Sequence, residues 1–304
     1  MKRFLSGILA VVMCMIFSIP TLAVEKIESN DCSASKLITS LQYPDAYIIE
    51  EVSYITKNKG TVLKEVSATV FVEETYALDN YGNPITISSR LLSENEVMAI
   101  GVENFEDINT AQLSSIGNLY QTRAATNSRG KLTITFSGEY YYDGAGVTAN
   151  LTAHAAWSAG AGLFNGSTRP AAGSDFMGVA WSGEFSAPSA SATASPTPPL
   201  LVMCASTPNA ARVWEFEESW TENVIGNTVS FYLRNLNINI TLHKNVLTGN
   251  GNTAEAVLKY IHTYSSTEGS ISINASPNDV GAGFTLNNVS KQWEIVCNLT
   301  GIPY

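Results

Sequence analysis

The 304-residue sequence is poor in charged residues, and the basic ones are the scarcer kind. It has 17 Lys and Arg against 27 Asp and Glu, which gives a net charge of −10 at pH 7. Proteins that bind nucleic acid or anionic membranes need clustered Lys and Arg to neutralise phosphate groups. The sequence has no such basic stripe, so we expect no nucleic-acid partner.

Motifs for metal, cofactor and nucleophile chemistry are also missing. Histidine occurs three times, at His154, His243 and His262, and the spacings of 89 and 19 residues match no metal-ligand pattern. Neither Cys-x-x-Cys nor Gly-x-Ser-x-Gly occurs. We therefore expect exposed or singly hydrogen-bonded histidines, no bound metal and no cofactor.

Long hydrophobic runs are absent apart from one at the start. Lys2 and Arg3 precede the apolar stretch Phe4–Ile19, and small residues up to Ala23 follow it. This layout predicts a signal peptide over residues 1–23 that is removed on export, and hence a secreted, extracellular protein. No later stretch approaches the ~20 apolar residues of a spanning helix, so we expect no stable membrane span after signal removal.

Cysteine is scarce as well. Beyond the predicted signal peptide only Cys32, Cys204 and Cys297 remain. Export permits disulfide formation, and Cys204 and Cys297 both lie in apolar, strand-like runs in the same half of the chain. We predict a disulfide between these two, and the alternative is a pair of buried free thiols.

What the sequence has in quantity is alternation of polar and apolar residues. Between Lys131 and Trp157 every second residue is apolar in two runs, which are separated by the turn residues Asp143, Gly144 and Gly146. Side chains on a strand point to opposite faces in turn, so this period predicts a half-buried β-hairpin. About nine such strands predict an antiparallel β-sandwich or jelly-roll-like domain over residues 131–304.

The preceding part of the chain is more acidic and of mixed character. Residues 24–107 contain strand-like runs, and the capping box of Ser93 and Glu96 predicts a short helix from Glu94 to about Glu106. The predicted fold class is thus mainly β, with a small α+β N-terminal region before the sandwich domain.

Two stretches lack any period. Residues 108–130 predict a linker, and trimming near Arg123 would make the region before it a pro-region, whereas without trimming it is an accessory domain. Residues 186–199 are dominated by Ser, Ala, Thr and Pro and predict a long loop, because they offer little apolar surface to bury.

The strongest candidate for chemistry is the acidic and aromatic run over residues 214–220. On a strand Glu215 and Glu217 would share one face about 7 Å apart, near the spacing of glycosidase carboxylates, and Trp214 and Trp220 are candidates to bind a ligand. A strand with one aromatic core face and one solvated acidic face explains the same residues, and we prefer that interpretation.

These observations favour a non-catalytic, secreted β-rich protein that acts by binding an extracellular protein or glycan on a cell surface, in a matrix or in solution. One alternative is a secreted hydrolase acting on glycans through Glu215 and Glu217. A second is a membrane-active exported toxin with a trimmed pro-region, because Ser- and Thr-rich alternating hairpins can assemble into barrels.

Overall fold

The structure is a computed structural model that describes residues 43–56, 62–78, 84–105, 126–142, 144–159, 174–198, 200–217, 219–224, 227–245, 251–264, 269–276, 278–281 and 283–304. The predicted signal peptide, Cys32 and Arg123 lie outside these residues. Among the residues that the structure describes, no helix is long and apolar enough to cross a membrane.

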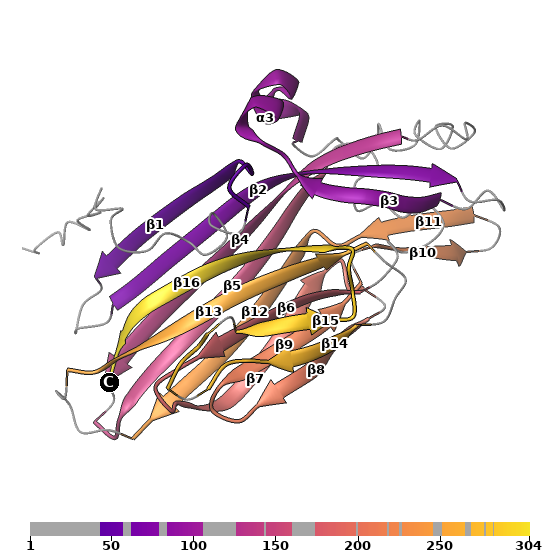
Figure 1. The fold of residues 1–304 in the computed structure, drawn as a ribbon. Coiled ribbons are helices and arrows are strands. Elements are labelled where there is room, and N and C mark those ends of the chain that lie inside the picture. Colours follow the sequence, from indigo (N-terminus) through magenta and orange to yellow (C-terminus); the bar gives the residue numbers. More distant parts are fainter. Residues whose placement is uncertain are drawn as a thin grey trace, which may run out of the picture.

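Two antiparallel sheets make up most of the described chain (Figure 1). The larger one, sheet A, has seven strands in the order β1-β2-β4-β5-β12-β7, with β3 paired to β2. Its strands are β1 (Ile48–Thr56), β2 (Val62–Leu78), β3 (Pro84–Leu91), β4 (Thr126–Tyr142), β5 (Val147–Ala159), β7 (Ser186–Ser195) and β12 (Asn235–Lys244).

The second sheet, sheet B, has five strands in the order β16-β13-β6-β9-β8. They are β6 (Asp175–Trp181), β8 (Leu201–Thr207), β9 (Ala211–Phe216), β13 (Thr253–Thr263) and β16 (Gln292–Pro303). A separate two-stranded sheet is formed by β10 (Ser219–Val224) and β11 (Asn227–Tyr232).

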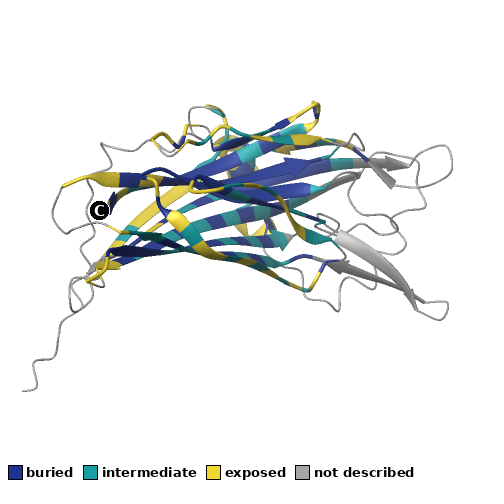
Figure 2. Ribbon diagram, turned by 90° about the horizontal axis from the view of Figure 1, so that it is seen from below, coloured by how far each residue is buried: buried dark blue, intermediate teal, exposed yellow. Residues whose placement is uncertain are grey.

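The core lies between the two sheets and follows the alternation of their strands. In β12, Leu236, Ile238 and Ile240 are at most 1% exposed and belong to one cluster with side chains of sheet B such as Leu258 and Trp181. Buried residues alternate with intermediate ones along the central strands (Figure 2), as expected where one face of a sheet packs on a core. The predicted β-sandwich class is therefore confirmed.

A third layer covers the outer face of sheet B. The hairpin of β14 (Ser270–Ile273) and β15 (Phe284–Asn287) places Phe284 and Leu286 in a cluster with Phe176, Val213 and Ile261 of sheet B. This cover explains why all seven residues of β6 are buried, because both faces of that strand are packed.

The predicted helix forms, in a shorter version. It runs as α3 (Glu94–Ile100) and is followed by the 3-10 turn η2 (Val102–Phe105), with Gly101 at φ 89 between them. The two segments cover one end of the outer face of sheet A, where Phe105 packs edge-on against Phe71 of β2 at 5.1 Å.

Strand pairing crosses the predicted boundary between the N-terminal region and the sandwich. Strand β2 pairs with β4 from Val62↔Tyr140 to Tyr76↔Thr126, so the described part of residues 24–107 contributes strands to sheet A. Residues 126–130 of the predicted linker belong to β4, and the remainder up to residue 125 lies outside the described residues. Both strands turn apolar side chains, such as Val66 of β2 and Leu132 of β4, toward the same core.

The predicted loop over residues 186–199 is wrong for most of its length, because residues 186–195 form the edge strand β7 paired with β12. Its small side chains alternate, with Ala190, Ala192 and Ala194 packed against the core cluster and the serines and threonine between them exposed. We predicted a loop because these residues offer little apolar surface to bury. The alternation of Ala with Ser is nevertheless enough to form an edge strand.

Candidate functional site

The acidic and aromatic run lies on β9, where its aromatic members face the core. Trp214 and Phe216 are 4% and 0% exposed, whereas Glu215 and Glu217 are half-buried on the other side. Burial, followed by the charge of Glu215, raises the pKa of Glu217. Trp220 is on β10, and its side chain lies outside the described residues.

The surroundings of Glu215 are those of a sheet surface. Its direct partners in the neighbouring strands are Phe176 of β6 and Val202 of β8, so at this position the carboxylate has apolar neighbours on both sides. Glycosidase carboxylates stand on opposite sides of the bond that they cleave, whereas Glu215 lies on β9 and Glu217 immediately follows the end of that strand.

The predicted disulfide is wrong, because Cys204 and Cys297 are both free. They lie on β8 and β16, the two edge strands of sheet B, with three strands between them. Four strand spacings amount to roughly 19 Å, well beyond the ~7 Å between Cα atoms that a disulfide can bridge. Burial raises the pKa of both thiols, that of Cys204 to about 11 with help from the charge of Glu215.

Two of the three histidines lie on the outer face of sheet A and are partly exposed, but His243 is not singly hydrogen-bonded, because its Nε2 also lies 2.9 Å from Oδ1 of Asn245. Nε2 of His154 is 3.1 Å from Oδ1 of Asn235, and Nδ1 of His243 is 3.0 Å from Oγ1 of Thr148. Among the described residues, no group of His, Cys, Asp and Glu is arranged to hold a metal ion.

The third histidine contradicts the prediction, since His262 of β13 is fully buried between two carboxylates. Its Nε2 is 2.8 Å from Oε1 of Glu74 and its Nδ1 is 3.0 Å from Oδ2 of Asp175, and both carboxylates are at most 2% exposed. The hydroxyl of Tyr260 also donates to Asp175. Ionised carboxylates only accept hydrogen bonds, so an imidazolium that donates from both nitrogens fits this position.

This buried cluster links the two sheets. Glu74 belongs to β2 of sheet A, whereas His262, Asp175 and Tyr260 belong to sheet B. All four side chains are at most 2% exposed, so their hydrogen bonds join the two sheets inside the core. The sequence offered no local signal for it, because Glu74 lies 188 residues before His262.

The outer face of sheet A carries a broad array of short polar side chains. Because successive side chains on a strand alternate, the residues opposite the core in β4, β5, β12 and β7 all lie on this face. We call the uncharged part of this outer face the polar face; its residues are Thr133, Thr135, Ser137, Thr148, Asn150, Thr152, His154, Ala156, Ser189, Ser191, Thr193, Ser195, Asn235, Asn237, Asn239, Thr241 and His243.

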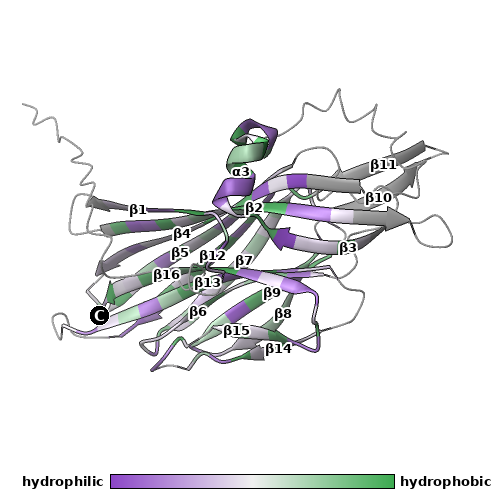
Figure 3. Ribbon diagram, turned by 45° about the horizontal axis from the view of Figure 1, so that its top comes forward, coloured by the Kyte–Doolittle hydropathy of each residue, from purple (hydrophilic) through white to green (hydrophobic). Residues whose placement is uncertain are grey.

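The polar face is uncharged when its histidines are neutral, although the chain carries a net charge of −10. Its side chains are held in place by bonds across the strands, such as Thr152 Oγ1 to Asn239 Oδ1 at 3.2 Å and Thr241 Oγ1 to Asn150 Oδ1 at 3.1 Å. Charged residues of the same outer face border it directly: Glu139 of β4 lies opposite Asn150, Glu65 of β2 lies opposite Ser137, and Lys131 follows Thr133 along β4. Figure 3 shows the alternation of hydropathy along the strands of both sheets.

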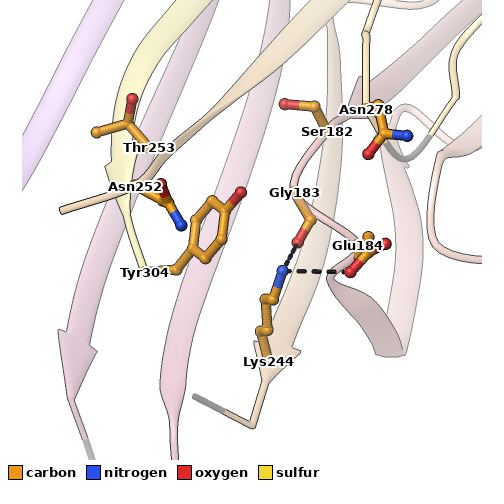
Figure 4. Close-up of a pocket in the computed structure, with 8 residues that line it drawn as sticks. All are labelled: Ser182, Gly183, Glu184, Lys244, Asn252, Thr253, Asn278 and Tyr304. Atoms are coloured by element: carbon orange, nitrogen blue, oxygen red, sulfur yellow. Dashed lines mark hydrogen bonds and ion pairs between the residues drawn. The ribbon is translucent and has the colours of Figure 1, made fainter. Parts of the chain in front are cut away.

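A separate pocket of about 360 Å³ lies where loops converge at one end of the sandwich (Figure 4). Segments from five parts of the chain line it, namely the turn between β6 and β7, the end of β12, the start of β13, the segment between β14 and β15, and the residue after β16. These are Ser182, Gly183, Glu184, Lys244, Asn252, Thr253, Asn278 and Tyr304.

Lys244 is the organising side chain of this pocket. Its ammonium group donates to the carbonyl of Gly183 at 2.6 Å, lies 3.6 Å from Oε2 of Glu184, and stands 4.0 Å from the ring centroid of Tyr304. None of these residues was predicted as a site residue, because the segments that meet here are far apart in sequence.

Comparisons with known proteins give little further information. No protein-family model matches the sequence. No curated protein matches it either.

Two solved structures are similar to this chain at a low level. The C-terminal domain of the Streptococcus pyogenes antigen I/II-family protein AspA has a TM-score of 0.25 and 6% identity, over 83% of this chain and 99% of that one. The collagen adhesin (CNA) from S. aureus has a TM-score of 0.23 and 8% identity, over 85% and 96% of the two chains. Scores this low carry no argument about function, and we base the function on the geometry of the chain.

Proposed function

We propose that this protein is a secreted, non-catalytic binding protein whose polar face attaches to an uncharged, hydroxyl-rich glycan. The observation that carries the proposal is a broad group of uncharged polar side chains that runs across four strands of an acidic protein, with Glu139 and Lys131 only at its edge on β4. Such a face neither attracts nor repels ions, so an uncharged polymer is the partner that it suits.

Hydrogen-bonding capacity supports a glycan partner. The Thr152 hydroxyl and the Asn239 amide bond each other through one donor and one acceptor. A hydroxyl has one donor and two acceptor sites, and an amide group adds two donors, so both groups keep capacity for a ligand. Neutral sugars present hydroxyl groups that both donate and accept, which matches this mixture.

The composition of the polar face argues against a protein partner. Stable protein interfaces are centred on buried Trp, Tyr, Arg or other large side chains, which supply most of the binding energy. The listed residues include none of these, and Ala156 is their one apolar member, while Tyr141 of β4 stands at the edge opposite Thr148. Many weak hydrogen bonds to a repeating polymer are the alternative source of affinity, since repeated contacts act together.

Cosedimentation of the secreted protein with insoluble cellulose, chitin and β-1,3-glucan tests the proposal. We expect binding to at least one of them, with little dependence on salt concentration because no ionic contact is involved. Introducing charge of either sign at the centre of the face, as Asn239→Lys or Asn239→Glu, should abolish binding because a charge would lose its water without gaining a partner.

Ser206 of β8 provides the matched control, because it is an exposed residue on sheet B, away from the polar face. Ser206→Lys and Ser206→Glu should bind as the unchanged protein does. The proposal fails if no neutral polysaccharide is bound, or if the Asn239 variants bind normally. Binding that one sign of charge strengthens would instead indicate an ionic partner.

A further inference from the structure

The pocket at the end of the sandwich is distinct from the polar face. Lys244 follows His243 on β12, and successive side chains of a strand point to opposite sides. His243 therefore lies on the polar face, whereas Lys244 turns toward Gly183, Glu184 and Tyr304 (Figure 4). The pocket can hold a ligand whether or not the polar face binds a glycan.

The turn beside the pocket contains an unfavourable backbone conformation. Gly183 and Glu184 have φ values of 82 and 58, both in the left-handed region. Glycine adopts this conformation without cost, but a residue with a long side chain does so uncommonly and under strain. Strain of this kind is concentrated at functional sites. The position of Glu184 thus points to a use for its carboxylate, whose side chain is 65% exposed.

The rest of the turn is held firmly. A Cβ atom on Gly183 would lie 2.8 Å from Cβ of Ala254 and 3.1 Å from the ring of Tyr304, so only glycine fits there. The backbone nitrogen of Ser182 donates to the carbonyl of Glu255 at 2.9 Å, and the backbone nitrogen of Glu255 donates to Oγ of Ser182 at 3.0 Å. The pocket is therefore preformed, which lowers the cost of binding.

The charges of the pocket exclude several ligand classes. Lys244 and Glu184 carry opposite charges 3.6 Å apart, so the pair has no net charge. A cation would meet the ammonium group of Lys244, and an anion would meet the carboxylate of Glu184. A hydrocarbon ligand would meet mainly polar groups, such as the amide of Asn278 and the hydroxyl of Thr253.

We propose that this pocket binds one neutral sugar ring, with two adjacent hydroxyl groups of the sugar bridging Lys244 and Glu184. One hydroxyl accepts a hydrogen bond from the ammonium group and its neighbour donates one to the carboxylate, and such charge-assisted bonds are stronger than neutral ones. The amide of Asn278 and the hydroxyl of Thr253 contact the remaining hydroxyl groups. The volume of about 360 Å³ is at the small end of ligand pockets, which suits a single ring.

The test is an NMR titration of the secreted protein with D-glucose, D-galactose, D-mannose and N-acetylglucosamine into the millimolar range. We expect at least one sugar to shift the signals of Gly183, Glu184 and Lys244. The Glu184→Gly variant removes the carboxylate and keeps a residue that accepts positive φ, so it should fold with unchanged or higher Tm. Its affinity for the sugar should fall about tenfold or more, as expected for the loss of a charge-assisted hydrogen bond.

Asn209→Gly is the matched control, because Asn209 also has a positive φ, 60, and is not among the residues that line the pocket. It should bind the sugar normally. The proposal is overturned if no sugar shifts these signals, if Glu184→Gly binds as tightly as the unchanged protein, or if Asn209→Gly loses binding equally. Tighter binding of sulfate or Ca²⁺ at these residues would also overturn it. The titration should be unaffected in Asn239→Lys, which separates it from the test of the polar face.

Discussion

The outer faces of the two sheets differ in polarity and in cover. This difference is the reason for assigning the proposed binding to sheet A. On sheet B the outer face carries Phe176, Val213 and Ile261, and the β14–β15 hairpin covers them. On sheet A the outer face carries Ser, Thr, Asn and His over four strands, and its described cover, α3 and η2, lies at one end over Phe71. The hairpin buries an apolar face of sheet B, whereas among the described residues most side chains of the polar face are at least partly exposed, which is why the proposed binding is assigned to sheet A.

The largest expected effect concerns the first three strands of sheet A, β1 to β3, and whether the sandwich folds without them. Removing residues 24–123 would take away β1, β2 and β3, leaving β4 as an edge strand and depriving the core of Val66, Val70 and Val72. Burial of each valine contributes about 1.5–3 kcal/mol, so their loss alone approaches the whole stability of a typical domain. We expect the remaining chain not to fold, as judged by circular dichroism and by the loss of a cooperative thermal transition.

This deletion also decides between two interpretations of the N-terminal region. A pro-region that is trimmed near Arg123 would leave a folded and active remainder. A folded fragment of residues 124–304 with the near-ultraviolet dichroism of the full chain would show that β1–β3 are dispensable, contrary to our expectation.

The next largest effect contrasts a polar group inside the sandwich with one on the polar face. Replacing His262 by Gln removes the imidazole that bonds both Glu74 and Asp175 in the core, and leaving a buried carboxylate without its partner costs about 3–5 kcal/mol. His154→Gln is the matched change on the polar face and should cost at most about 1 kcal/mol. Urea denaturation of both variants measures the difference, and similar losses would contradict the assignment of the buried cluster as a link between sheets.

A smaller effect tests the cover on sheet B. Leu286 of β15 is 6% exposed and packs on sheet B, so Leu286→Ala should cost about 2–3 kcal/mol. Asn239→Ala on the polar face should change stability by less than about 0.5 kcal/mol, because the site is exposed. If the two substitutions cost the same in thermal denaturation, the hairpin is not a packed layer.

The smallest effect concerns α3, which covers one end of the outer face of sheet A. Bonds from the backbone nitrogen and hydroxyl of Ser93, and then from Arg90, lower the pKa of Glu96 to about 2 from the ordinary 4.5. A lowered pKa stabilises the folded state above pH 4.5, and this contribution is lost as the pH falls through about 2. An NMR titration should place the midpoint of Glu96 near 2, and Ser93→Ala should raise it. A midpoint near 4.5 would mean that the capping box does not form in solution.

The fold was largely predictable because it depends on a local period. The alternation over Leu236–Leu242 and Val147–Trp157 is visible residue by residue, and it correctly placed His154 and His243 on the outer face. Strand β7 was missed because alanine contributes little area, although it alternates with serine as a strand requires. Pairing between β2 and β4 could not be predicted, since more than 45 residues separate the two strands and neither sequence specifies which strand it pairs with.

The candidate sites were less predictable, because each depends on contacts between distant segments. The charged pair in the pocket joins Glu184 to Lys244, and the buried cluster joins Glu74 to His262. The run from Trp214 to Glu217 attracted attention because its acidic and aromatic residues are adjacent, and the structure separates them onto opposite sides of β9. The polar face lies between these cases, since the alternation that produces it is visible in residues 131–157, but its extent depends on the order of strands in sheet A.

The central claim is that the open face of sheet A recognises a neutral glycan, and chemical-shift mapping with a soluble cello-oligosaccharide or β-1,3-glucan oligosaccharide tests it most directly. We predict that the amide and side-chain signals of Thr152, Asn239 and Thr193 shift together on titration, while those of the β14–β15 hairpin stay unchanged. Shifts confined to the hairpin, or none on the polar face with either oligosaccharide, would contradict the claim.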